Sequence, residues 1–440
     1  MPNYAAPGVF VEEVPGGARP IGAVGTSTAG FIGHAPDRAA RVDEAVAVNS
    51  WTEFLTIFCG PANNPKPPET THLANAVYGF FDNGGSRCYV VNIGKSDAIT
   101  GTGRKRTGLQ VLETIDEIAI VAAPGFTDPA AHEALLSHCE RLAFPVAILD
   151  PPSDVDNIDR LVEVATAGET PAPGDKPAKA AAAKEKPADG DEGAAAGAPG
   201  EAAPSAPAAP AKPAAPASGG LRPRQSDQGT FYFPWIKVRD PLGGQIVTAP
   251  PSGHMAGTWA RTDATRGVHK APANEPLRGA LDVTYRVTRQ EQEKLNPQGV
   301  NCIRYFAAEG IRVWGARTLA AEASEWRYIN VRRLFNAVGR SIELGTGWMV
   351  FEPNDLTLWK SIRRDITAFL TSVWRDGALM GRTPQEAFFV KCDEETNPAD
   401  QRDQGRVIAL IGLAVVKPAE FVIFRLSQWA GGAQTDVMGG

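Results

Sequence analysis

Two short stretches, 94–96 and 103–108, each resemble part of a phosphate-binding loop. Gly94-Lys95-Ser96 matches the end of such a loop, but Tyr89 stands where its first glycine is required. Without that glycine the backbone N–H groups cannot turn toward a phosphate. Gly103 and Gly108 have the required spacing, yet no lysine follows the second of them. We therefore expect no nucleotide site and no bound cofactor.

A serine near the N-terminus could act as a nucleophile. Ser27 lies in a Gly-Thr-Ser-Thr-Ala segment like that of subtilisin-like proteases, and Asp263 and His269 could complete a triad. In those enzymes the chain order is Asp, His, Ser, whereas this serine precedes every histidine. A glycine- and threonine-rich strand edge, with Asp263 in a turn, explains the same residues. We expect no catalytic residue here.

Metal-ligating and acid–base side chains gather in few places. His132, His138 and Cys139 are close in sequence, but a helix would place residues 132 and 138 on different faces, and a metal site needs three or four converging ligands. The pairs Glu12-Glu13 and Glu394-Glu395 are typical of solvated or capping groups. The five cysteines are far apart and form no C-x-x-C pair, which favours reduced, buried thiols. We expect no metal site and no enzyme.

Composition limits the class of protein further. The chain has 440 residues, enough for two or three domains, and 44 basic against 50 acidic side chains give a net charge of -6. A nucleic-acid binder should carry a basic excess instead, so we expect no nucleic-acid partner. The first residues lack the basic start and apolar run of an export signal. Polar residues and a proline interrupt the most apolar stretch, 407–424, so we expect assembly in the cytoplasm without direct membrane insertion.

One segment differs in kind from the rest of the chain. In residues 171–220, 37 of 50 residues are Ala, Pro or Gly, and none is aromatic, Leu, Ile or Val. Such a stretch cannot bury enough apolar surface to offset its ordering entropy. We expect a disordered insertion at the surface, which could be either a linker between domains or a loop that extends from one domain.

The ordered sequence before and after this insertion predicts an α/β layer. Short apolar runs alternate with helical patterns, and a further helix from Pro129 to Ala143 has Asp128 as its N-cap. Alternation of this kind indicates a largely parallel sheet. The expected strands are 46–48, 88–93, 118–122 and 146–150, followed after the insertion by 231–238, 303–306 and 311–314.

The last hundred residues predict a small α+β domain. Apolar stripes at helical spacing run from Val331 to Ile342 and from Leu358 to Val373, and two apolar strands follow at 407–416 and 421–428. The opposite helix faces are basic and carry Arg332, Arg333 and Arg340 on the first helix and Lys360, Arg363 and Arg364 on the second.

Both termini contain strand-like segments that glycine and proline isolate from their neighbours. The first is 8–14, between Pro7 and Pro15, and the second is 421–426, after Lys417-Pro418. Each has backbone groups that need partners. The segments can pair within the same molecule or complete the sheet of a neighbouring one, and composition leaves both possibilities open.

Long motifs outside residues 168–224 carry a resemblance to a known family. They are Pro7 to Val14, Phe80 to Val91, Pro250 to His254, Ala260 to Asp263, Asn296 to Asn301, Arg312 to Thr318, Trp326 to Arg333, Phe351 to Asp355 and Lys391 to Asn397. Together they resemble contractile tail sheath proteins, and within that family most of all the sheath proteins of phage-tail-like extracellular contractile injection systems.

The resemblance implies a fold and a division of the chain. It implies a subtilisin-like α/β sheath domain over 23–320, interrupted by the Ala/Pro-rich insertion at 168–224, and a smaller α+β inner domain over 321–418. Extended β arms, 1–22 and 419–440, are expected to link subunits. The arm residues expected in inter-subunit strands are Val9, Phe10, Val11, Glu12, Glu13, Val14, Phe421, Val422, Ile423, Phe424 and Leu426.

The resemblance also implies a role. The chain is expected to polymerise as stacked hexameric rings around an inner tube and to contract, driving the tube through a target envelope. Its partners would be further copies of itself, the inner tube protein, and baseplate and terminal cap proteins, within a phage-tail-like particle assembled in the cytoplasm. Candidate tube-facing residues are Arg332, Arg333, Lys360, Arg363 and Arg364, and the alternative for them is an ordinary solvated helix face.

Three other functions stay open at this point. The sheath of a myophage tail belongs to the same class. An inactive or permuted subtilisin-like hydrolase would be a monomer that does not need residues 1–22. A nucleotide-binding α/β protein would bind ATP.

Overall fold

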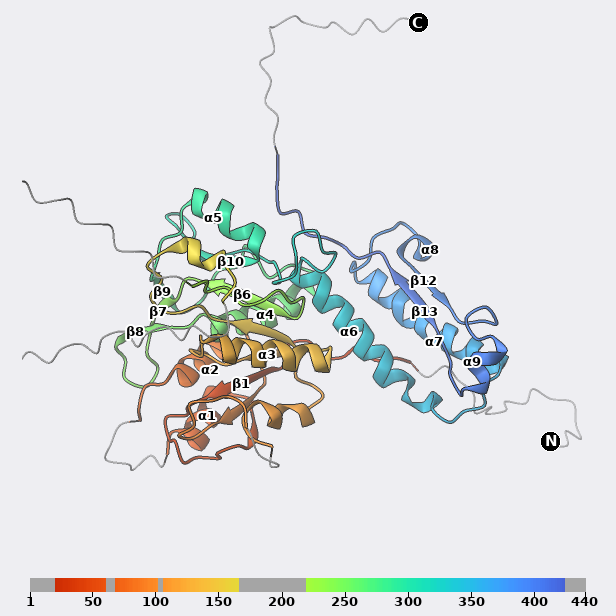
Figure 1. Cartoon of the computed structure of the whole chain (residues 1–440), viewed down its shortest axis with the longest axis horizontal. Helices are drawn as coiled ribbons and strands as arrows, with labels where there is room; N and C mark the ends of the chain where they lie inside the picture. The colour runs from red at the N-terminus through yellow and green to blue at the C-terminus, as the bar shows by residue number, and fades with distance from the viewer. Residues whose placement is uncertain (1–19, 61–67, 102–105, 166–218, 424–440) are drawn as a thin grey trace, which may run out of the picture.

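The computed structural model describes residues 20–60, 68–101, 106–165 and 219–423 (Figure 1). The predicted N-terminal arm strand, the Ala/Pro-rich segment 166–218, and Phe424 and Leu426 lie outside the described residues.

An eight-stranded sheet forms the centre of the larger part of the molecule, in the order β11-β10-β6-β5-β4-β1-β3-β2. The inner strands are parallel, whereas β2 and β11 pair antiparallel at the two edges. This confirms the predicted α/β layer. The strands are β1 (Ala29–Gly33), β2 (Ala45–Val48), β3 (Cys88–Asn92), β4 (Ile120–Ala122), β5 (Val146–Leu149), β6 (Gly229–Phe233), β10 (Val300–Phe306) and β11 (Gly310–Trp314).

Helices cover both faces of this sheet because successive residues of a buried strand point to opposite sides. Phe31 faces a core formed with α1 (Trp51–Phe58), α2 (His72–Asp82) and α4 (Ser252–Arg266). The next residue, Ile32, faces a second core formed with α3 (Pro129–Leu142) and α5 (Arg289–Leu295). Short 3-10 helices are η1 (Leu109–Thr114), η2 (Ile158–Leu161) and η3 (Asn296–Gln298).

Capping groups and glycines set where these helices start and how closely they pack. Asp128 caps α3 as predicted, since its side chain accepts a hydrogen bond from the Ala131 N–H. Helix α4, which the sequence did not predict, packs closely on α2. A Cβ added to Gly253 would lie 2.3 Å from the Cα of Ala76, so this contact requires glycine.

The predicted strand 231–238 is wrong in one respect, because the chain divides it between two sheets. Residues up to Phe233 stay in the central sheet, while β7 (Ile236–Arg239) joins a separate three-stranded sheet with β8 (Ile246–Ala249) and β9 (Ala280–Val283). Proline at 234 cannot donate a ladder hydrogen bond, which fits an interruption at this place.

The C-terminal part has its own core, as predicted for a small α+β domain. Helices α6 (Ile329–Thr346) and α7 (Leu356–Arg375) pack their apolar stripes together and against a two-stranded antiparallel sheet. In Figure 1, α6 runs from the central sheet toward this second unit. The remaining elements are η4 (Gly347–Met349), α8 (Pro384–Ala387), β12 (Phe388–Lys391), α9 (Ala399–Asp403) and β13 (Leu410–Leu413).

Candidate interaction sites

The described residues on either side of segment 166–218 lie next to each other. The N–H of Ala165 donates to the Arg222 carbonyl at 2.8 Å, and the N–H of Arg222 donates to the Glu163 carbonyl at 3.0 Å. The N–H of Leu221 donates to the Arg160 carbonyl at 2.7 Å. The chain therefore leaves and re-enters one domain at the same place. Of the two alternatives that the sequence leaves open, this supports a loop that extends from one domain and not a linker between domains.

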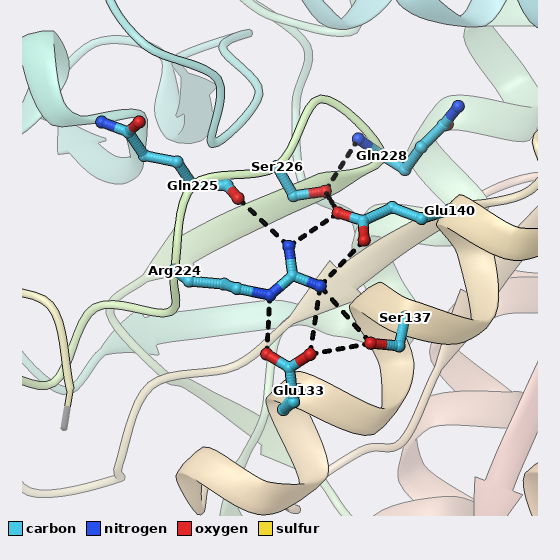
Figure 2. Close-up of polar contacts among 7 residues, drawn as sticks. All are labelled: Glu133, Ser137, Glu140, Arg224, Gln225, Ser226 and Gln228. Carbon is cyan, nitrogen blue, oxygen red and sulfur yellow. Dashed lines mark hydrogen bonds and ion pairs between the residues drawn. The ribbon is translucent and has the colours of Figure 1, made fainter. Parts of the chain in front are cut away.

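Arg224 fixes the returning chain on helix α3 (Figure 2). Its guanidinium lies between two carboxylates of that helix, with Nε 2.6 Å from Glu133 Oε2 and Nη1 2.7 Å from Glu140 Oε1. The Ser226 hydroxyl also donates to Glu140, at 2.6 Å. Hydrogen bonds from Arg224 hold the pKa of both carboxyls below their usual range.

A carboxylate fixes the chain immediately before the C-terminal arm. Glu420 accepts hydrogen bonds from Arg317 Nε at 2.9 Å and Nη2 at 2.8 Å, from Asn296 Nδ2 at 2.6 Å and from the Tyr328 hydroxyl at 3.0 Å. Burial acts to raise the pKa of Glu420, but the hydrogen bonds and charge of Arg317, with the bonds from Asn296 and Tyr328, outweigh burial and lower it. The next residues, 421–423, are exposed and form no strand, so the arm departs from a defined point.

The segment that precedes β1 lies along α6 and ends beside the C-terminal core. The N–H of Val24 donates to Ser341 Oγ at 3.0 Å, and Ile21 is buried in the same core as α6 and α7. A Cβ added to Gly345, in the last turn of α6, would come within 2.8 Å of the Ile21 side chain. The described part of the chain therefore begins beside the far end of α6.

Two of the predicted tube-facing residues, Arg332 and Arg333 of α6, pair with carboxylates of their own chain. Arg333 has a side chain only 3% exposed and lies between Asp263, at 2.5 Å, and the ring of Trp259, at 4.6 Å. Arg332 pairs with Asp227 at 3.0 Å and stacks on Trp326. The Arg333 guanidinium is therefore buried, whereas that of Arg332 is half-buried in its ion pair.

The same contacts bear on the hypothetical triad. Asp263 accepts hydrogen bonds from Arg333 on both carboxylate oxygens and from the Thr26 hydroxyl on Oδ2, at 2.6 Å. Its two oxygens are therefore engaged and do not orient a histidine for Ser27. Among the residues that the structure describes, no three His, Cys, Asp or Glu side chains gather as a metal site would require.

The exposed face of α7 keeps its basic character. Lys360, Arg363 and Arg364 are all exposed, whereas Trp359, Ile362 and Ile366 on the opposite face are buried. Arg364 contacts Asp365 through Nε at 3.0 Å. Within the described part of the chain, Lys360 and Arg363 have no ion-pair partner. This face is available to an acidic surface.

The β12–β13 sheet presents two edges that could each accept another strand. Each of the two strands pairs only with the other within the described ranges, so their outer backbone groups face away from the sheet. Each strand also exposes an apolar side chain of its own, with Phe389 of β12 59% exposed and Leu410 of β13 51% exposed. Unpaired edges with exposed apolar residues are typical sites of strand addition.

No described helix is both long and apolar enough to cross a membrane. Two adjoining hollows of about 450 and 430 Å³ share His72 and Thr248 in their walls.

Comparison with known protein families gives two adjoining matches. Residues 224–319 match the model of the phage tail sheath protein central domain, and residues 321–428 match that of the phage tail sheath C-terminal domain. Both matches begin after the segment 166–218.

Curated relatives are tail sheath proteins of phages and prophages. The chain is 31% identical over 178 residues to the tail sheath protein of Vibrio phage KVP40, covering 40% of this chain and 25% of that protein. It is 29% identical over 205 residues to a putative prophage major tail sheath protein of Pseudomonas aeruginosa, covering 44% of this chain and 51% of that protein. The chain thus aligns with a quarter to a half of the length of these relatives.

Solved structures match over almost the whole chain. A chain of the PVC sheath complex, an extracellular contractile injection system in its contracted state, gives a TM-score of 0.69 at 27% identity and covers 98% of this chain and 99% of that chain. A chain of the anti-feeding prophage baseplate gives 0.68 at 28% identity, with coverages of 97% and 99%.

Sequence reasoning missed the contacts that fix the arm and the loop. Glu420 is the only acidic residue between Lys417 and the apolar run that follows, and Arg224 is the second arginine after the Ala/Pro-rich segment. These positions were a signal for anchoring groups, but their partners lie far away in sequence.

Proposed function

This chain belongs to the contractile tail sheath family, and on that basis we propose that it is the structural sheath subunit of a phage-tail-like contractile injection system. The observation that carries the proposal is the match, over 97–98% of the chain, to chains of the PVC sheath complex and of the anti-feeding prophage helical sheath. Like its relatives, which are structural sheath proteins, the chain is not an enzyme.

The proposed assembly is a stack of hexameric rings around an inner tube. Contraction of this helical sheath would push the tube through a target envelope. Assembly would take place in the cytoplasm, and the particle would also contain the inner tube, baseplate and terminal cap proteins. A likeness to a chain of the anti-feeding prophage baseplate in its contracted state supports the baseplate as a partner.

Exchanged β arms would link the subunits. Strands over Val9 to Val14 and over Phe421 to Leu426 would pair with the open edges of the β12–β13 sheet in neighbouring copies. About nineteen residues precede the anchored Ile21 segment, and an extended chain of that length reaches about 60 Å. Each inter-strand hydrogen bond contributes only about 1 kcal/mol net, so the links are individually weak and become strong through repetition.

The exposed face of α7 would contact the inner tube. Lys360 and Arg363 provide positive charge without an ion-pair partner among the described residues, and Arg364, which contacts Asp365, is exposed beside them. Complementary charge on the tube would set the orientation of the subunit and the rate of its association. The subtilisin-like topology and the domain boundaries 23–320 and 321–418 remain predictions of the same family assignment.

A phage tail is the second candidate setting, since curated relatives include the sheath of Vibrio phage KVP40. Electron microscopy of the protein produced with its cognate inner tube tests the shared proposal. We expect hollow tubes with a helical surface that encloses the inner tube. Monodisperse single subunits in the presence of the tube would refute it.

A further inference from the structure

The turn between α6 and α7 holds a phenylalanine in an unusual state. Phe351 is 102% exposed and has a backbone φ of +69°. The left-handed region is unfavourable for a bulky side chain, and burial of the ring within the described residues does not offset that cost here. A strained and exposed residue of this kind is a candidate for a functional role.

Neighbouring residues extend the exposed apolar surface around this ring. Val350 and Leu356 are also exposed, and so is Leu344 near the end of α6. Exposed aliphatic and aromatic side chains that gather at one turn mark an interaction surface, whereas single ones are common on any protein. We call Val350, Phe351 and Leu356 the apolar tip.

The apolar tip continues into the basic face of α7. Leu356, Lys360 and Arg363 stand at positions i, i+4 and i+7 of the helix and therefore share one face. A partner that covers this face must combine acidic groups with an apolar recess at one end. Because the apolar tip and the basic face adjoin, one molecule contacts both. The acidic partner of α7 is therefore also the partner of the apolar tip.

We propose that Phe351 is the aromatic anchor of the sheath on the inner tube, and that its ring enters an apolar recess of the acidic tube surface that faces α7. This inference rests on the proposed function. Aromatic side chains that fill a pocket within a polar rim dominate the affinity of many interfaces. Phe351 would thus supply binding strength, while Lys360 and Arg363 supply attraction and orientation.

Substitutions at this position separate binding from folding. Asparagine and glycine both tolerate a positive φ, so Phe351→Asn and Phe351→Gly remove the ring without adding strain. Phe351→Tyr keeps an aromatic ring. Ile246→Ala serves as a matched control, since Ile246 is 62% exposed on the distant strand β8.

Binding would be measured by sedimentation of the full chain with preassembled inner tubes. We expect Phe351→Asn and Phe351→Gly to bind at least about 30-fold more weakly, the size of a hot-spot loss. Phe351→Tyr and the Ile246→Ala control should stay within about 3-fold of the wild type. The thermal unfolding midpoints of the Asn and Gly variants should equal or exceed that of the wild type.

Four results would overturn the inference or its premise. Tube binding by Phe351→Asn within about 3-fold of wild type would show that the ring is no anchor. A lowered unfolding midpoint would show that Phe351 packs on its own chain, including residues 1–19. Normal tube binding with lost subunit–subunit contacts would assign the ring to a second copy. Failure of the wild-type chain to bind tubes would refute the proposed function itself.

Discussion

Removing the charge of two arginines on neighbouring helices should change the stability of the fold in one case and not in the other. Arg333 of α6 is buried, with its side chain 3% exposed and that of Asp263 5% exposed, and it also donates to the Thr26 carbonyl at 2.9 Å. Arg363 of α7 is exposed. We expect Arg333→Met to destabilise the fold and Arg363→Met to leave the fold unchanged.

The magnitude follows from what each substitution leaves behind. Methionine at 333 preserves volume but leaves the Asp263 carboxylate buried without its cation, and breaking a buried pair in this way costs about 3–5 kcal/mol. The contact of Arg333 with the Trp259 ring is lost as well. An exposed arginine away from such a network changes stability by less than about 0.5 kcal/mol.

Urea denaturation would measure both effects, followed by tryptophan fluorescence and by circular dichroism. Trp259 lies beneath the Arg333 guanidinium and reports on this region directly. A loss of under about 1 kcal/mol for Arg333→Met would refute the reasoning from burial.

In tube sedimentation Arg363→Glu should reduce binding most at low salt, since salt screens exposed charges. Unchanged binding at both low and high salt would count against a tube-facing α7.

Three further predictions concern the anchors and the packing. The low pKa of Glu420 means that its contribution to stability is present above the unfolded pKa of about 4.3 and is lost as the pH falls through the folded value. In urea titrations at pH 7 and pH 3, the wild type should therefore lose more stability on acidification than Glu420→Gln. An equal loss in the two proteins would contradict this. Replacing 166–218 by a short Gly/Ser bridge should leave assembly and unfolding unchanged, because its ends are already paired; electron micrographs without tubes would contradict this. Gly253→Ala should cost about 1–3 kcal/mol through overpacking of α4 on Ala76, measured by urea denaturation; an unchanged midpoint would show that the helices can separate at no cost.

Local patterns were sufficient to predict most of the central sheet and its helices. The run from Cys88 forms β3, and Asp128 caps α3. Both depend on residues near in sequence. The division of 231–238 between two sheets depends instead on where β8 and β9 lie, which no local pattern reveals.

The surfaces were harder to predict for the same reason. The apolar stripe of α6 predicts an outer face for Arg333, but Asp263, seventy residues away, covers this side chain. Lys360 and Arg363 stayed exposed because nothing in the described residues packs over that side of α7. The Glu420–Arg317 contact joins residues 103 apart, so the anchor of the C-terminal arm required the structure.

The exchange of arms between subunits is the central claim of the proposed assembly. Negative-stain electron microscopy of the protein, produced with its cognate inner tube and with or without residues 1–19, tests it most directly. The truncation spares Ile21, which is part of the C-terminal core. We expect helical sheaths from the full chain, and folded but unassembled subunits from the chain without residues 1–19. Sheaths of normal length without residues 1–19 would contradict it.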